Sequence, residues 1–259
     1  MTEHRRLSGG QSRSGGMPTR KLEAYRYADI DALASVWTSL AAPERVEIAA
    51  QQRLQQIWLP SGDEVDVRRV EMVVGGGAVV RIFALNNAAR YGRYEIDVTM
   101  HEGADFALYG ANIGGGESTL EILTTLKHVA PGATSHQTIR SVLGDKATGS
   151  FLGRIEVARE GQQTDAEQSV KAMLLDRGAT ANAKPELEIF ADDVKCAHGA
   201  TVGELDRNQL HYAAARGLDP VAARALLLEG FVAGLWDEIE GEDQGIADIA
   251  RAALRKVAA

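Results

Sequence analysis

Cysteine is almost absent from this chain, which has only Cys196 in its 259 residues. A single thiol cannot form an internal disulfide, so the sequence is typical of a protein of a reducing compartment such as the cytoplasm. Long apolar runs are also lacking: no stretch approaches the roughly 20 residues of a membrane span, and the start of the chain lacks the apolar core of a secretory signal. The formal net charge of −8 argues against a nucleic-acid or anionic-membrane surface. We therefore expect neither nucleic acid nor membrane among the partners.

The signatures of common enzyme classes are missing as well. The sequence contains no phosphate-binding loop, dinucleotide fingerprint, HExxH zinc motif or nucleophile elbow. His101, His128 and His136 are scattered along the chain without a ligand spacing, so each is predicted to be structural. These absences favour a scaffold over an enzyme.

The composition divides the chain into four parts. Residues 1–16 are rich in Ser, Gly and Arg and are predicted to form a disordered tail. Residues 17–60 are predicted to form a helical segment, because Ala, Leu, Gln and Arg dominate both 29–41 and 42–58, and Pro60-Ser-Gly62 ends it.

Residues 61–200 change to short runs of alternating apolar and polar residues, separated by turns rich in glycine. This pattern predicts strands without intervening helices. Several glycine turns recur at a constant interval: the spacing from Gly115 to Gly132 is the same as that from Gly132 to Gly149. Such an interval suggests one coil of a β-helix per repeat, with an irregular β-sandwich or barrel as the alternative.

Residues 201–259 return to helical patterns. Thr201-Val-Gly-Glu204 has the form of a capping box that opens a helix running to Arg216, and Asp219-Pro220 has the form of a cap and first turn of a second helix. A last helix is predicted from about Asp243 to Val257. This part is therefore expected to be a C-terminal helical domain.

Around the single cysteine, residues Glu186–Val194 alternate as in a strand. If that strand continues, Cys196 and His198 project from the same face, because strand side chains repeat every two residues. A lone cysteine is most often a small buried apolar residue. Here the polar neighbourhood, including Asp192 and Asp193, is expected to keep the thiol accessible and to lower its pKa. A thiol and an imidazole on one face are half of a metal or cluster site.

The segment from Pro185 to Asp206, with its Cys-Ala-His-Gly-Ala-Thr run, resembles the signature of the SufB/SufD family, in its SufD form. Residues from about Gly149 to Leu235 are also similar to this family, and Tyr25-Arg-Tyr27 stands where family members often carry an N-terminal triplet. The resemblance implies a right-handed parallel β-helix in a scaffold component of iron–sulfur cluster assembly. The short helical segment before the β-helix departs from the longer one of the family.

The same resemblance implies partners and site residues. A SufB-like subunit would pair with this chain, and a SufC-like ATPase would dock on the C-terminal helices, for which we select Leu227, Phe231 and Trp236. A transient Fe–S cluster would form at the shared interface, with His198 as ligand and Cys196 as a supporting or iron-binding residue, and with Asp192 and Asp193 in support. One thiolate cannot hold such a cluster alone, since clusters usually take four.

Two other functions stay open at this point. A β-helix enzyme acting on carbohydrates would require carboxylates gathered along one groove. A purely structural module would instead associate with a second copy of itself through its last coil.

Overall fold

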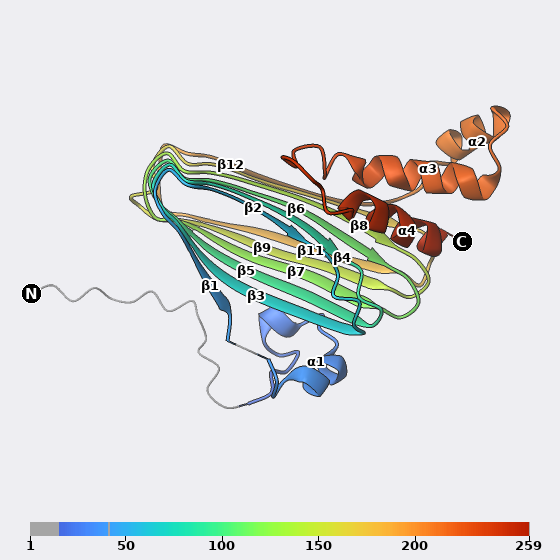
Figure 1. Cartoon of the computed structure of the whole chain (residues 1–259), viewed down its shortest axis with the longest axis horizontal. Helices are drawn as coiled ribbons and strands as arrows, with labels where there is room; N and C mark the ends of the chain where they lie inside the picture. The colour runs from blue at the N-terminus through green and yellow to red at the C-terminus, as the bar shows by residue number, and fades with distance from the viewer. Residues whose placement is uncertain (1–15, 41, 259) are drawn as a thin grey trace, which may run out of the picture.

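The computed structural model describes residues 16–40 and 42–258 of the chain. Two parallel sheets of six strands each face one another and are wound from a single continuous coil (Figure 1). Sheet A has the order β1-β3-β5-β7-β9-β11, and sheet B the order β12-β10-β8-β6-β4-β2. Since the chain alternates between the sheets at every strand, each coil contributes one strand to each of them. The predicted parallel β-helix is confirmed. The predicted tail falls almost wholly on residues 1–15, which lie outside the described part.

The strands are long and regular, and most have ten residues. Those of sheet A are β1 (Glu44–Ile48), β3 (Val65–Val74), β5 (Tyr91–Met100), β7 (Thr119–His128), β9 (Thr148–Val157) and β11 (Thr180–Ile189). Those of sheet B are β2 (Arg53–Trp58), β4 (Val79–Asn86), β6 (Asp105–Gly114), β8 (Thr134–Leu143), β10 (Asp165–Leu174) and β12 (Lys195–Glu204).

Each coil of the β-helix is longer than the interval between the glycine turns had indicated. Arg53 on β2 pairs with Val79 on β4, and Thr148 on β9 pairs with Thr180 on β11, so the chain stacks on itself only after every second strand. The constant interval between the glycine turns is instead close to half a coil, that is, one strand and one turn. A coil needs two such halves because it must cross both sheets before it stacks on itself.

The space between the sheets is filled by every second residue of each strand, as the pleat requires. Strand β4 shows the rule, since Val80, Ile82 and Ala84 are buried in the central core, and Phe106 and Leu108 on β6 stack on the same side. Burial of this continuous apolar column stabilises the coil at roughly 25 cal/mol for each Å² of apolar surface removed from water.

The turns at one end of the sheets also stack from coil to coil. Gly77, Gly103 and Gly132 each adopt a positive φ, which glycine reaches without steric cost. Their backbone N–H groups donate to carbonyls of the next coil, as in Gly77 to Glu102 (2.8 Å) and Gly132 to Gln162 (2.8 Å). The glycines that marked turns in the sequence therefore serve the stacking of the coils.

The N-terminal segment is only partly helical. A short 3-10 helix, η1 (Glu23–Tyr25), and helix α1 (Ile30–Val36), which is capped by Asp29, precede the sheets. The helix predicted over 42–58 is wrong, because this stretch forms β1 and β2. Ile48 and Trp58 are buried in the central core, and pairing with the next coil outweighs the helical propensity of the Gln- and Arg-rich stretch.

Residues 16–40 cover part of the outer face of sheet A, beside which α1 lies in Figure 1. Beneath this cover Arg93 and Glu121, each about 1% exposed, form an ion pair of 2.9 Å. The hydroxyl of Tyr91 donates to the same carboxylate at 2.6 Å, and Arg93 donates to the carbonyl of Ala24 at 2.8 Å. The N-terminal segment therefore closes a buried charged network, which ties it to the β-helix.

Three helices follow the last strand: α2 (Arg207–Ala215), α3 (Pro220–Ala233) and α4 (Ile246–Ala258). The capping box predicted at Thr201–Glu204 is wrong, because these residues belong to β12, and Asp206 caps α2 instead. The predicted cap of α3 is confirmed, since the Asp219 carboxylate accepts from the N–H groups of its first turn. No helix within residues 16–40 and 42–258 is both long and apolar enough to cross a membrane.

Helices α3 and α4 lie over the outer face of sheet B (Figure 1). Leu228 and Val232 of α3 and Leu254 of α4 pack with Phe83 and Val142 of the sheet into a second apolar cluster. The C-terminal helices are therefore part of the same folded unit as the β-helix.

Candidate functional site at the open end of the coil

Strand β12 is the last strand of sheet B and pairs only with β10 on one side. Nine of its ten residues are exposed, and only Cys196 is half-buried. No further coil covers this strand within the described part of the chain. We call β11 and β12, with the turn between them, the open end.

The two edges of the open end differ in composition. Strand β11 carries Lys184, Pro185 and Glu186, which are residue types that discourage another strand from pairing. Strand β12 has no charged residue and no proline between Lys195 and Glu204. Its edge is consequently the one that is open to pairing with another chain.

The backbone of β12 shows which groups are free for such pairing. The N–H of Lys195 donates to Thr164 across the ladder with β10 (2.8 Å). In a parallel ladder, successive residues direct their N–H groups alternately to one side and the other. The N–H groups of Cys196, His198 and Ala200 therefore point away from β10, toward the free edge.

Cys196 and His198 share the face that is directed toward the space between the sheets. The structure pairs them with Ala166 and Gln168 of β10, which are both buried, so the predicted common face is confirmed. The strand is not the predicted one, however. Strand β11 ends at Ile189, and a turn separates it from β12.

The thiol of Cys196 packs against the edge of the central core. Burial, and to a lesser extent the carboxylate of Asp165, raises its pKa above the ordinary value. The expectation of a lowered thiol pKa is therefore wrong, because apolar contacts outweigh the polar neighbours in sequence. In this state the sulfur is a neutral thiol at pH 7, and it becomes a thiolate ligand only when a cation displaces its proton.

Asp192 and Asp193 lie in the turn between β11 and β12, and both are exposed. Asp193 holds this turn through its backbone: its N–H donates to the side chain of Gln162 (3.0 Å), and its carbonyl accepts from the N–H of Gln163 (2.6 Å). The two carboxylates therefore flank the strand that carries Cys196 without sharing its inward face.

The other candidate histidines lie elsewhere. His128 is buried and bonds to the hydroxyl of Ser135 (3.0 Å), and His136 pairs with Glu167 on the outer face of sheet B (3.0 Å). Over residues 16–40 and 42–258, no three His, Cys, Asp or Glu side chains gather closely enough to hold a metal ion. Cys196 and His198 would thus need donors from outside the described chain to complete a site.

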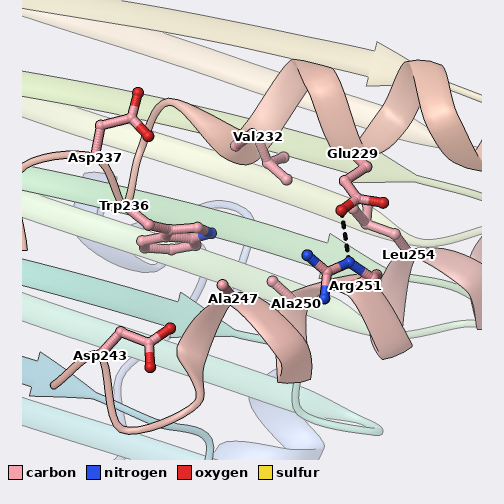
Figure 2. A pocket seen from close by; sticks show the side chains of 10 residues that line it. Glu229, Val232, Trp236, Asp237, Asp243, Ala247, Ala250, Arg251 and Leu254 are labelled. Carbon is pink, nitrogen blue, oxygen red and sulfur yellow. Dashed lines mark hydrogen bonds and ion pairs between the residues drawn. The ribbon is translucent and has the colours of Figure 1, made fainter.

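The residues selected on the C-terminal helices are only partly accessible. Leu227, Phe231 and Trp236 are half-buried, and Phe231 faces its own sheet, with the guanidinium of Arg140 6.0 Å from its ring centre. Trp236 lines a pocket of about 220 Å³ between α3 and α4, beside the ion pair of Glu229 and Arg251 (Figure 2). Sequence reasoning missed the more exposed apolar side chains of α2, of α3 and of the loop between them, which are Tyr212, Leu218, Val221 and Leu226.

The sequence of this chain matches a known protein family. The family described as "SUF system FeS cluster assembly, SufBD core domain" matches residues 31–231, which is most of the chain. This chain belongs to the SufBD family. The resemblance found in the sequence motifs is confirmed, and the match extends well before Gly149, through coils that carry no such motif.

Curated relatives point to the same family. The chain is 30% identical over 180 residues to an iron–sulfur cluster assembly SufBD family protein of Synechocystis, a match that covers 69% of this chain and 40% of the relative. It is 36% identical over 119 residues to the iron–sulfur cluster assembly protein SufD of Escherichia coli (46% of this chain, 28% of the relative). It is 30% identical over 139 residues to SufD of Bacillus subtilis (53% and 32%). The chain thus spans less than half of the length of these relatives.

Within this SufBD chain, the motif that carried the resemblance coincides with the open end. Its residues run from the edge of β11 through the turn and along β12, and so form the last coil, which no further coil covers in the part of the chain that the structure describes. The most recognisable stretch of the sequence is therefore also the stretch with free backbone groups, an exposed imidazole and a half-buried thiol.

Proposed function

We propose that this chain is a scaffold subunit of an iron–sulfur cluster assembly complex. In this proposal it pairs with a SufB-like subunit through the free edge of β12, carries a SufC-like ATPase on its C-terminal helices and contributes His198 and Cys196 to a nascent cluster at the shared interface. The cluster is the cargo of the complex and is completed by donors from the partner. The chain itself is proposed to be no enzyme, and ATP hydrolysis belongs to the SufC-like partner.

The observation that carries the proposal is the unprotected edge of β12. Nine of the ten residues of β12 are exposed, and the strand has no charged residue and no proline between its two ends. Every second backbone N–H group of the strand points toward the free edge. The family motif lies on this strand. Natural proteins usually block such edges when they are not interfaces. Pairing here brings the partner's side chains next to Cys196 and His198, which on their own offer too few ligands.

The pairing is tested by removing one outward N–H group. Ala200→Pro eliminates the donor on the free edge, and the preceding Gly199 tolerates the restriction that proline imposes. Ala200→Ser keeps the donor and is the matched control. We expect both variants to fold, and only Ala200→Pro to fail to co-purify with a SufB-like partner upon co-expression. Recovery of the complex at the wild-type level with Ala200→Pro contradicts the pairing.

The same experiment separates the rival functions. Recovery of SufB-like and SufC-like proteins supports the scaffold, and self-association alone supports a homodimeric module. Hydrolysis of a polysaccharide by the purified chain would support a carbohydrate-active enzyme instead.

Of the two proposed ligands, the exposed imidazole of His198 is expected to contribute more to cluster binding than the protonated thiol of Cys196. We expect Cys196→Ser to reduce the cluster content of the complex no more than His198→Ala does. A larger loss with Cys196→Ser reverses this ranking.

The ATPase is proposed to dock on the C-terminal helices. Leu227, Phe231 and Trp236 remain candidates, and of the three Trp236 lines the pocket between α3 and α4 (Figure 2). The exposed side chains Val221 and Leu226 of α3 extend the candidate surface. Leu226→Lys is expected to reduce co-purification of the SufC-like protein while pairing with the SufB-like subunit persists, and equal retention of both partners contradicts this surface.

A further inference from the structure

Three polar side chains of sheet B lie one above another in the space between the sheets and form a column that ends at the open end. Gln137 on β8, Gln168 on β10 and His198 on β12 occupy equivalent positions in three successive coils. Paired residues of neighbouring parallel strands project from the same face, and the strands are about 4.8 Å apart. The imidazole of His198 therefore belongs to the layer directly above the amide of Gln168.

Sheet A lies across this space from the column, and the residue that it places opposite differs in each of the three coils. In the first, the hydroxyl of Thr124 donates to the amide oxygen of Gln137 (2.6 Å). In the second, the residue paired with Thr124 is Gly153, which has no side chain. In the third it is Pro185, which offers no side-chain donor or acceptor. The cross-wall hydrogen bond of the first coil consequently has no equivalent above it.

Gly153 also makes room for the longer side chain opposite. A methyl group added at Gly153 would lie 2.6 Å from the amide nitrogen of Gln168 and would also clash with the ring of Phe151. Gln168 thus reaches across to a backbone position where a threonine, as at Thr124, would not fit.

The amide of Gln168 is left unsatisfied by this arrangement. The residue is fully buried, and in the described part of the chain neither its amide oxygen nor its amide nitrogen has a hydrogen-bond partner. Buried amides in native proteins are nearly always paired, directly or through ordered water, because an unpaired one is costly. In its column the residue lies between Gln137, whose amide oxygen is bonded to Thr124 and whose amide nitrogen is also unpaired, and the imidazole of His198 on the side of the open end.

We infer that Gln168 is a positioning residue for His198. Its amide oxygen accepts a hydrogen bond from the Nδ1–H of the imidazole, directly or through one ordered water molecule. Nδ1 is the ring nitrogen nearer to the strand, so Nε2 keeps its lone pair and faces the open end. A hydrogen bond to one ring nitrogen fixes the tautomer and orientation of a metal-binding histidine. The inference rests on the proposed role of His198 as a cluster ligand.

The test is the tautomer of the neutral imidazole, measured by nitrogen NMR on the whole chain with labelled histidine, with His198→Gln to assign the signal. Gln168→Met removes the amide and retains the length of the side chain, and Gln137→Met is the matched control one coil below. We expect the Nδ1–H form to dominate in the wild type and in Gln137→Met. In Gln168→Met the ratio is expected to shift toward the Nε2–H form that free histidine prefers.

An unchanged tautomer ratio in Gln168→Met overturns the inference, as does a wild type that is mainly in the Nε2–H form. Gln168→Ser, which is too short to reach the imidazole, gives the same shift and replaces Gln168→Met should the latter not fold. Unfolding curves of the variants report separately on general damage to the core.

Cluster content distinguishes this inference from the function on which it rests. In the complex with the SufB-like and SufC-like partners, Gln168→Met is expected to lower cluster content about tenfold, as loss of an outer-shell partner does. Wild-type cluster content with His198→Ala refutes the ligand role, whatever the tautomer result. Loss of cluster with His198→Ala, combined with an unchanged tautomer in Gln168→Met, refutes only the positioning role.

Discussion

Acidification is expected to destabilise this chain through one buried imidazole, that of His128. The side chain lies between the sheets with no measurable exposure, and it bonds to the hydroxyl of Ser135 at 3.0 Å. Burial lowers its pKa from 6.5 to about 4, since the charged form would have to be desolvated. The folded chain therefore resists taking up a proton that the unfolded chain binds readily.

The sign and size of the effect follow from this difference. Above pH 6.5 both states carry a neutral imidazole, and stability is unaffected. As the pH falls, the unfolded state is protonated first, so stability is lost between pH 6.5 and about 4. A pKa difference of this size corresponds to about 3 kcal/mol, of which about 2 kcal/mol is lost by pH 5.

Urea denaturation at a series of pH values from 7 to 4 measures this loss. Carboxylates also titrate in this range, so the informative quantity is the difference between wild type and His128→Gln, which keeps a hydrogen-bonding group but does not titrate. His136→Gln is the matched control, because it removes an exposed histidine of the outer face and leaves the buried imidazole of His128, with the loss of stability that it causes, in place. If the free energy of unfolding of the wild type falls with pH in parallel with that of His128→Gln down to pH 4, the reasoning is refuted.

Three further outcomes are expected. Arg93→Met leaves the buried carboxylate of Glu121 without its cationic partner and should lower the free energy of unfolding by about 3–5 kcal/mol. Adding Glu121→Leu should restore most of this loss. A loss below about 1 kcal/mol in urea titrations contradicts the buried pair. Leu228→Ala, at the fully buried junction of α3 and sheet B, should cost about 2–5 kcal/mol, and a near-zero change in the same titration would show that the helices do not pack there. The raised pKa of Cys196 should make iodoacetamide react with it more slowly at pH 7.5 than with free cysteine, and faster alkylation contradicts a neutral, half-buried thiol.

Much of the β-helix could be predicted from the sequence because its physical signals are local. The period-two alternation of apolar residues marks strands, and glycines at positive φ, such as Gly103 and Gly132, mark the turns. The length of a coil could not be derived in the same way. The chain must cross two sheets before it stacks on itself, and no local pattern shows whether a turn closes half a coil or a whole one.

The errors have a common cause, which is that strand pairing overrides local propensity. Residues 42–58 are rich in helix-forming side chains, yet Ile48 and Trp58 complete the first coil of the core. Thr201 and Glu204 have the spacing of a capping box, but both belong to the strand that pairs with β10. Such long-range contacts are not visible in a window of neighbouring residues.

For the candidate site, sequence reasoning identified Cys196 and His198 and their common face, but not their surroundings. The thiol pKa was expected to fall because charged residues are close in sequence, whereas the core that touches the sulfur comes from other coils. Gln168 lies a whole coil before His198 along the chain, and only the register of β10 and β12 places it below the imidazole.

The most direct test of the central claim is the iron and acid-labile sulfide content of the complex purified after co-expression of this chain with SufB-like and SufC-like partners. We predict that His198→Ala leaves the folded chain and the composition of the complex unchanged, while cluster content falls to a small fraction of the wild-type value. A His198→Ala complex with the full wild-type content of iron and sulfide would contradict the account.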